Sequence, residues 1–341
     1  MEGLALEQAK AVSELPFIQN VFAMPDLHAG KTPVGITAVS ENIIYPHLIG
    51  TDIGCGMSVF GTQIEKKKIK QEKWVARLNT IKTLSAVPSG VFYPDCPIPD
   101  FGTLGSGNHF AEFQTVHTLY DKEGLCGLGM DEKETYITVH SGSRSYGSDI
   151  FSEYKNYNGY EINDARAKSY MAKHDDALIW SARNREEVAA KLIGYLGFYP
   201  FITKKLECNH NFLEICGEKA YHRKGSVSSK NGAVLIAGSR GSLSYIVKPT
   251  DKCNEFGYSL AHGAGRKWAR SMCKSRIKDK YDSYTIKRNK YGGELVCHDL
   301  ALTYEEAPEA YKSIDNIIDI LKEYGLIELI ATMTPVLTFK G

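Results

Sequence analysis

Histidine is the residue type best able to do chemistry in this chain, and several of its ten histidines lie in short runs rich in glycine, serine and asparagine. His109 lies in the run 102–112, His140 in 139–144 and His210 in 209–212. Because glycine and small polar residues interrupt regular structure, such runs predict loops that bring imidazoles together. Imidazole is a common metal ligand. For each histidine taken alone, a core residue with satisfied hydrogen bonds is the alternative.

A carboxylate and a thiol lie three residues apart in the run Asp52-Ile-Gly-Cys55-Gly. The glycines allow both groups to approach one cation, with the thiolate as a soft donor and the carboxylate as a hard one. A buried cysteine in a tight turn is the alternative. Together with the three histidines, these residues could hold one or two divalent ions, and the ligand types leave zinc, iron and manganese open.

His262 differs from the other histidines because it is enclosed by glycine and alanine in the run 259–266, directly before a basic segment. A histidine beside phosphate-binding backbone amides is well placed to act as a nucleophile toward phosphorus. A helix cap in a tight turn is the alternative explanation for this run.

Three further runs predict phosphate-binding surface. Small residues and Arg144 follow His140, a combination typical of a phosphate or carboxylate cradle. The other two runs are 222–229 and 237–245. Neither is a Walker loop, and no G-x-G-x-x-G follows a predicted strand. A nucleotide would therefore have to be bound in some other way.

The composition is that of an ordinary globular protein, with 341 residues, 43% hydrophobic residues and a formal net charge of +1. Disordered, collagen-like and coiled-coil chains are disfavoured, and a near-neutral total gives no global footprint for nucleic acid. No stretch approaches the roughly 20 apolar residues of a membrane span, and the first residues do not resemble a secretory signal. We expect a cytoplasmic protein with reduced thiols.

Positive charge is concentrated between Arg266 and Lys290, where ten Lys and Arg stand against two Asp. Trp268, Tyr281 and Tyr284 are interleaved with these cations, which suits single-stranded nucleic acid. An ordinary basic surface helix is the alternative. We predict a basic helical segment over 266–290.

The elements that position these motifs alternate without a regular βαβ rhythm. Helical periodicity predicts helices over 2–14, 65–86 and 152–197. Strands are predicted over 17–24, 34–39, 58–63, 211–215, 234–237 and 244–247. No internal repeat or linker marks a boundary, so we predict one compact mixed α/β domain over 1–341.

Nine motifs, in order along residues 25–341, together resemble the RtcB family of RNA ligases. They are Pro25-Asp-Leu-His28, Asp52-Ile-Gly-Cys55-Gly, Gly107-Asn-His109-Phe-x-Glu112, His140-Ser-Gly-Ser-Arg144, Asn209-His210-Asn211, His222-Arg-Lys-Gly225, Gly238-Ser239, Ala261-His262-Gly-Ala-Gly-Arg266 and Lys340-Gly341. On this resemblance the chain is identified as a short member of the family. The implied fold has central β-structure, flanking helices and a deep two-metal cleft.

The resemblance implies joining of an RNA 2′,3′-cyclic phosphate or 3′-phosphate to a 5′-hydroxyl, in RNA repair or tRNA splicing, with GTP as co-substrate and two Mn²⁺ ions. His262 would attack the α-phosphorus of GTP and carry GMP, which then passes to the RNA end as RNA(3′)pp(5′)G. Cys55 would bridge the two ions, with His109 on one ion. Asp52, His140 and His210 would lie on the other.

The resemblance also implies a guanylate pocket and contacts to RNA phosphates. The pocket would consist of Asn108, Phe110, Glu112, Asn211, Gly238, Ser239, Ser244, Gly263, Ala264, Gly265, Tyr311 and Lys340, and the RNA phosphates would contact Arg144, Lys224 and Arg266. Because a next-to-last residue is usually frayed, Lys340 predicts a tail that folds back into the site. The implied partners are RNA with broken ends and an activating archease-type protein, and we expect a monomer.

Two features depart from the family pattern. The interval from Cys55 to His109 is 54 residues, shorter than is usual in the family, and Ala261 stands where the family often has serine. The first departure predicts a reshaped RNA surface. Two other functions stay open: a metal-dependent phosphoesterase that acts on RNA ends without GTP, and a non-catalytic RNA-end-binding module.

Overall fold

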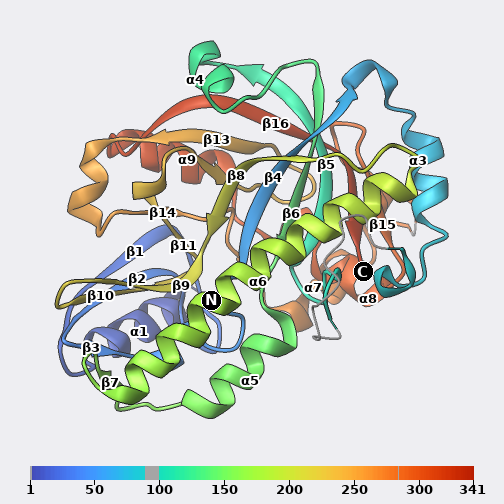
Figure 1. Cartoon of the computed structure of the whole chain (residues 1–341). Coiled ribbons are helices and arrows are strands. Elements are labelled where there is room, and N and C mark those ends of the chain that lie inside the picture. Colours follow the sequence, from blue (N-terminus) through green and yellow to red (C-terminus); the bar gives the residue numbers. More distant parts are fainter. Residues whose placement is uncertain (1, 89–99, 283) are drawn as a thin grey trace.

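The computed structural model describes residues 2–88, 100–282 and 284–341 (Figure 1). Its largest sheet has eight strands, and all neighbouring strands are antiparallel except β15 and β16. In order across the sheet they are β12 (Val234–Ile236), β13 (Ser244–Pro249), β16 (Ile327–Lys340), β5 (Phe110–Leu119), β6 (Glu134–Ser141), β4 (Gly56–Glu65) and β8 (Thr203–Asn209), with β15 (Glu294–Cys297) beside β16. The Leu235 amide donates to Cys208 Sγ at 3.3 Å, so the two ends of the sheet nearly close.

A second sheet of four strands lies beside the first, with two short strand pairs next to it. Its order is β1 (Ile18–His28), β2 (Val34–Glu41), β10 (Lys219–Lys224) and β9 (Asn211–Cys216). The short pairs are β11 (Ser226–Ser228) with β14 (Ser259–Ala261), and β3 (Ile43–Ile44) with β7 (Tyr160–Glu161). Most of the motifs noted above lie at the ends of strands or in the connections between strands of both sheets.

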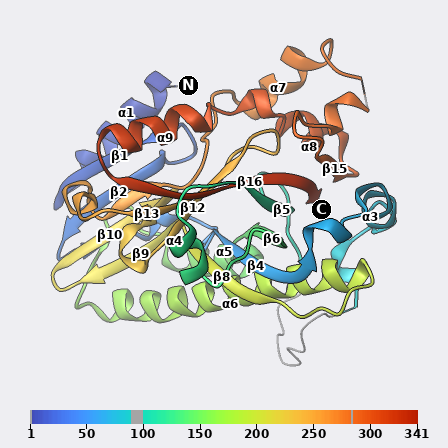
Figure 2. The ribbon, with the colours of Figure 1, turned by 90° about the horizontal axis from the view of Figure 1, so that it is seen from above.

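Helices cover both faces of the large sheet. The long α6 (Ala165–Tyr195) and α9 (Ile314–Glu323) lie on opposite sides of the molecule, with β16 between them (Figure 2). The other helices are α1 (Glu2–Ser13), α2 (Pro46–Ile49), α3 (Gln71–Leu78), α4 (Lys122–Gly127), α5 (Arg144–Tyr154), α7 (Arg270–Ile277) and α8 (Leu300–Glu305). No helix among the described residues is long and apolar enough to cross a membrane.

Each face of the sheet has its own apolar core. Leu192 of α6 packs in a cluster with Phe113 and Val139, whereas Ile317 of α9 packs in a cluster with Ile246. A strand that is covered on both faces is expected to be apolar on both, and the polar side chains that remain buried there need a reason. Many of them lie at the site described below.

The predicted mixed α/β fold is confirmed, and the predicted strands all overlap observed ones. The predicted helix over 65–86 is wrong: it is a 3₁₀ turn at Lys66–Lys68, then α3 of only eight residues, then a second 3₁₀ turn at Leu84–Ala86. Trp74 and Leu78 are the two buried residues of α3, so the apolar face ends there. The helix predicted over 152–197 is also interrupted, because β7 lies between α5 and α6.

The basic segment 266–290 is only partly helical, so that prediction is corrected too. Helix α7 covers Arg270–Ile277 alone, and Thr285–Lys287 is a 3₁₀ turn. The Asp282 carboxylate accepts hydrogen bonds from the backbone of Tyr284 and Thr285, which stabilises a turn instead of a continued helix.

Candidate metal centre and nucleotide cavity

Strand register brings the predicted ligands into one row. In the sheet Phe110 pairs with His140, and Met57 also pairs with His140, on the opposite side of β6. Gly56 pairs with Asn209. His109, Cys55 and His210 each directly precede or follow one of these paired residues in the chain. The row is therefore His109, His140, Cys55 and His210, although Cys55 and His210 are 155 positions apart in the sequence.

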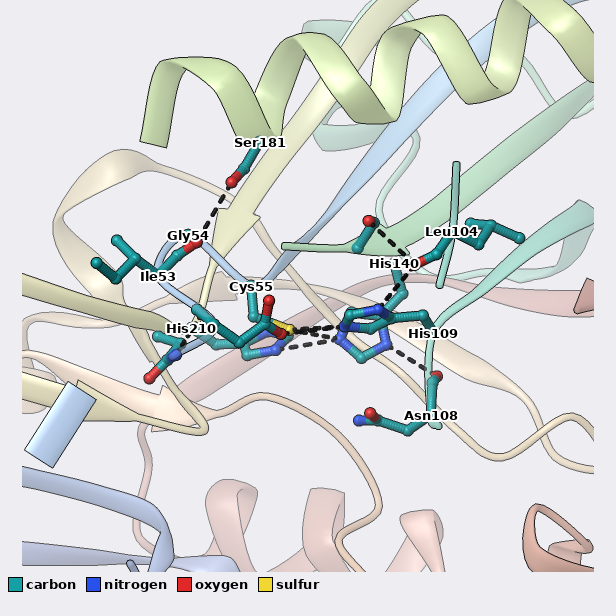
Figure 3. Close-up of polar contacts among 12 residues, drawn as sticks. Ile53, Gly54, Cys55, Leu104, Asn108, His109, His140, Ser181 and His210 are labelled. Carbon is teal, nitrogen blue, oxygen red and sulfur yellow. Dashed lines mark hydrogen bonds and ion pairs between the residues drawn. The ribbon is translucent and has the colours of Figure 1, made fainter. Parts of the chain in front are cut away.

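These four side chains converge (Figure 3), and Asp52 contacts one of them, His109. Cys55 Sγ lies 3.4 Å from His109 Nε2 and 3.3 Å from His140 Nε2. His140 Nε2 is 3.2 Å from His210 Nε2, and His109 Nε2 is 3.1 Å from Asp52 Oδ2. We call these five residues the cluster. The ligand atoms of Cys55, His109 and His140 all lie within 4.8 Å of one another.

The outer ring nitrogens show why the cluster fits a metal. His109 Nδ1 lies 2.9 Å from the Leu104 carbonyl, and His140 Nδ1 lies 3.2 Å from the Asn108 carbonyl. A carbonyl only accepts hydrogen bonds, so both Nδ1 atoms must donate. His109 Nε2 faces the Asp52 carboxylate and can bond to it only as a donor, whereas a neutral His140 ring has its lone pair on Nε2. The Cys55 thiol and His210 Nε2 both face this one lone pair, so they cannot both donate to it.

The polar groups of the cluster therefore cannot all be satisfied by one another. Burial lowers the pKa of His140 and of His210 well below the ordinary value, so both rings are neutral at neutral pH. A divalent cation between the thiol, the cluster-facing imidazole nitrogens and the carboxylate would satisfy these groups, and this donor set suits zinc, iron or manganese. His210 Nδ1, on the other edge of its ring, is buried without a hydrogen-bond partner among the described residues.

The two acidic groups of the cluster differ in charge. Burial, with the Asp52 carboxylate, raises the pKa of the Cys55 thiol well above its ordinary value. Burial also acts to raise the pKa of Asp52, but the neighbouring His109 and Lys224 hold it well below its usual range. The protein alone thus keeps Asp52 ionised and Cys55 protonated. A coordinating cation ionises such a thiol.

His262 lies next to the cluster and is paired with a carboxylate. Its ring centroid is 4.6 Å from that of His210, and its Nδ1 is 2.6 Å from Oδ2 of the fully buried Asp26 in β1. The carboxylate fixes the proton on Nδ1 and leaves the lone pair on Nε2. Gly265 has φ of +64°, and a Cβ there would lie 2.2 Å from the Asp26 carbonyl, so only glycine fits.

Asp26 is a functional residue that the sequence analysis missed, although it stands in the quoted motif Pro25-Asp-Leu-His28. Its partner lies 236 positions away. His28 of the same motif stacks on His262, with ring centroids 6.4 Å apart, and lines the cavity described next.

His262 and four of the five cluster residues, all except His109, line a cavity of about 350 Å³. Every predicted guanylate residue lines this cavity except Ser244, whose hydroxyl lies behind the wall and accepts from the Gly238 amide at 3.1 Å. Lys340 is buried in the wall and belongs to β16, which pairs with β15 and β5. The tail therefore reaches the cavity, as the sequence predicts.

Two carboxylates also line the cavity. Glu112 accepts hydrogen bonds from Gln114 and, at 2.5 Å, from Thr338, and burial raises its pKa to about 7. Glu306 was not predicted. The Glu306 network, as we call it, joins its carboxylate to Arg266 (2.9 Å), Lys340 (3.6 Å), Arg270 (3.9 Å) and the Tyr311 hydroxyl. Three cations against one carboxylate leave excess positive charge, which favours an anionic ligand.

The predicted RNA-phosphate residues separate into two groups. Lys224 and Arg266 line the cavity, and Lys224 Nζ also donates to the Ile49 carbonyl at 2.6 Å. Arg144, at the start of α5, is not among the described residues that line it. The run 222–229 is not a phosphate surface throughout, because His222 accepts from the Tyr45 amide inside the protein and Arg223 is fully buried.

Fold and site together define a mixed α/β protein with a buried Cys/His cluster beside a cation-lined cavity. The family model described as "tRNA-splicing ligase RtcB" matches residues 8–96 and 94–341, so the chain belongs to the RtcB family. It is 36% identical to RNA-splicing ligase RtcB2 of an Escherichia coli strain, over all of this chain and 93% of that protein.

More distant relatives include RNA-splicing ligase RtcB of Escherichia coli K12 and tRNA-splicing ligase RtcB of Archaeoglobus fulgidus. Both are 26% identical over all of this chain, and they are covered to 95% and 92%. The archaeal alignment extends over 446 positions and the RtcB2 alignment over 356, against 341 residues here. This chain thus lacks many residues of the archaeal protein but is close in length to RtcB2.

Proposed function

We propose that this chain is a GTP- and manganese-dependent RNA ligase that joins 2′,3′-cyclic phosphate or 3′-phosphate ends to 5′-hydroxyl ends. The observation that carries the proposal is the position of His262. It is held by Asp26 at 2.6 Å, lies beside the cluster and faces a cation-lined cavity. The names of the relatives, which are splicing ligases, support the same reaction class.

The cluster would hold two Mn²⁺ ions on either side of Cys55. The distances favour Asp52 with His109 on one side and His140 with His210 on the other. The family resemblance instead implies that Asp52 shares an ion with His140 and His210. When bound, the ions would stabilise the negative oxygens of phosphoryl transfer.

His262 would begin the reaction as a nucleophile. Its Nε2 lone pair attacks the α-phosphorus of GTP, the N–P bond forms, and the bond from phosphorus to the bridging oxygen breaks to release pyrophosphate. The Asp26 carboxylate, 2.6 Å from Nδ1, stabilises the positive charge that develops on the ring. Asp26 is therefore a positioning residue that acts through His262.

The RNA end would then be activated and joined. A cyclic phosphate is first opened by water to a 3′-phosphate, whose oxygen attacks the guanylate phosphorus and breaks the N–P bond, which frees His262. The 5′-hydroxyl finally attacks the RNA 3′-phosphorus and GMP leaves. Lys224, Arg266 and Arg270 line the cavity and would bind the phosphate oxygens of these species.

Glu112 would select guanine in the cavity. The guanine edge has two donors, N1–H and the N2 amino group, and an ionised carboxylate accepts from both. Tyr311 and Lys340 line the same region. Outside the cavity, the exposed cations of 267–290 would bind the RNA backbone, and the half-exposed Tyr284 beneath Arg288 would stack on a base.

The decisive test is incubation of the protein with α-labelled GTP and Mn²⁺. We expect acid-labile label on the wild-type chain and none on His262→Ala. An unlabelled wild-type chain, or a labelled His262→Ala chain, contradicts the proposal.

Opening of cyclic phosphates without nucleotide and without joined product would instead indicate a phosphoesterase. Salt-sensitive RNA binding without any product would indicate an RNA-end-binding module. The archease-type partner, the monomeric state and the cytoplasmic location stay predictions.

A further inference from the structure

Helix α6 carries three fully buried polar side chains on the face that meets the cluster loops. They are Ser181, Asn184 and Arg185, each with 0% of its surface exposed. Their spacing of three and four residues puts them on one face of the helix. Burying polar and charged groups is costly unless they are paired, so their partners indicate what they do.

Arg185 uses all five of its N–H donors. They go to Ser58 Oγ (2.7 Å), the Gly54 carbonyl (2.9 Å), the Ser141 carbonyl (2.6 Å), Asn209 Oδ1 (2.8 Å) and the Glu207 carboxylate. Glu207 balances the buried charge. A planar guanidinium is the only side chain that can supply this many donors in a fixed geometry.

Three of these acceptors are chain neighbours of cluster residues. Gly54 precedes Cys55, Ser141 follows His140, and Asn209 precedes His210. One guanidinium therefore joins three separate segments, at the positions next to their ligands.

Asn184 and Ser181 extend the same arrangement to the remaining ligands. The Asn184 amide accepts from the Gly102 amide at 2.7 Å and donates to the Thr103 carbonyl at 3.0 Å. Thr103 precedes Leu104, whose carbonyl orients His109. The Ser181 hydroxyl lies 3.3 Å from the carbonyl of Ile53, which stands between Asp52 and Cys55 (Figure 3), and 2.7 Å from the Ala177 carbonyl of its own helix, and the two carbonyls share its one proton. A Cβ on Gly54 would lie 2.8 Å from Ser181 Oγ, so the loop approaches α6 closely.

We propose that Arg185, supported by Asn184 and Ser181, is the positioning residue that holds the cluster ligands in a metal-ready geometry. This inference rests on the metal site of the proposed function. Outer-shell partners of this kind typically change metal affinity by about 10–100-fold when they are removed. Arg185→Lys keeps the charge but loses the planar fork, so we expect a loss of metal affinity in that range.

Arg223 provides a matched control because it is also fully buried and paired with a carboxylate. Its Nη1 donates to Ser259 at 2.6 Å and its Nη2 to Glu214 at 3.1 Å, and among the described residues none that accepts its hydrogen bonds adjoins a cluster residue. Arg223→Lys thus perturbs a buried arginine without disturbing the ligand segments.

The experiment is a titration of the full-length wild type, Arg185→Lys and Arg223→Lys with Co²⁺, followed by its thiolate charge-transfer absorption. Circular dichroism and thermal unfolding of the metal-free proteins report folding. We expect weaker binding, or an altered spectrum, for Arg185→Lys alone. If Arg185→Lys does not fold, Asn184→Ala takes its place, with an expected loss of about tenfold.

Wild-type affinity and spectrum in the α6 variant would overturn the inference, as would an equal loss in Arg223→Lys. Absence of Co²⁺ binding by the wild type would overturn the metal site itself. The two failures are therefore distinguishable.

Discussion

Two groups of residues in the cavity wall, the cluster and the Glu306 network, differ in the charge that they leave unbalanced. In the Glu306 network one carboxylate is paired with three cations and a hydroxyl, so positive charge is in excess. In the cluster, imidazole nitrogens and a thiol face one another and cannot all be satisfied by the protein alone. The network therefore favours an anionic ligand, whereas the cluster favours a cation.

The largest expected effect concerns His262, which lies beside the cluster. Asp26→Asn replaces the acceptor that fixes the Nδ1 proton, and in a comparable His–Asp pair such a change lowers the rate about 10⁴-fold. We expect a similar loss in the rate of labelling by α-labelled GTP, with Co²⁺ affinity unchanged. The exposed Asp315→Asn is the matched control. Labelling at the wild-type rate would contradict the role of Asp26.

The next prediction tests whether the cluster depends on a cation. Cys55→Ser removes the central donor, so metal affinity should fall by more than the roughly 10–100-fold expected for an outer-shell partner. Thermal unfolding in chelator should change little, because the thiol has no good internal partner to lose. A large loss of stability in chelator would show that Cys55 is a packing residue.

A substitution in the Glu306 network should have the reverse effect, with a loss of protein stability and no loss of metal binding. Glu306→Gln leaves three cations without their carboxylate, and breaking a buried ion pair costs about 3–5 kcal/mol. We expect a loss of unfolding free energy near the lower bound, since Arg270 is half-exposed, with Co²⁺ binding unaffected. Urea denaturation measures the first quantity. Unchanged stability would remove the distinction between the network and the cluster.

The smallest effect concerns pH. Burial raises the pKa of Glu112 to about 7, so below that value the carboxyl is protonated and must lose a proton to accept both guanine donors. Guanosine affinity should therefore fall by about tenfold per pH unit below 7 and level off above it. Guanosine avoids the titration of the GTP phosphates. Glu112→Gln should bind weakly without this pH dependence, and a pH-dependent Glu112→Gln would exclude Glu112 as the titrating group.

Much of the site could be predicted because its ligands lie in glycine-rich runs whose residue types are informative on their own. His109, Cys55 and His210 are examples. Asp26, Glu306 and Arg185 could not be found in this way, since their meaning lies in partners far along the chain, such as the 131 positions between Arg185 and Gly54. In the sequence of α6, polar residues spaced three and four apart interrupt an otherwise apolar face, and this is a signal that could have indicated Arg185.

Local patterns were also misleading where tertiary packing limits an element. The amphipathic pattern over 65–86 continues beyond Leu78, but α3 buries only Trp74 and Leu78 and ends there. The concentration of basic residues over 266–290 likewise gave no indication that Asp282 stabilises a turn. Such hydrogen bonds from a side chain to nearby backbone amides compete with the backbone hydrogen bonds of a helix.

The most direct test of the central claim is a crystal structure of the Mn²⁺-soaked protein with anomalous data collected at the manganese edge. Our account predicts two peaks that flank Cys55 Sγ, one beside Asp52 and His109 and the other beside His140 and His210. Peaks at the Glu306 network, or an absence of peaks around Cys55, would contradict it.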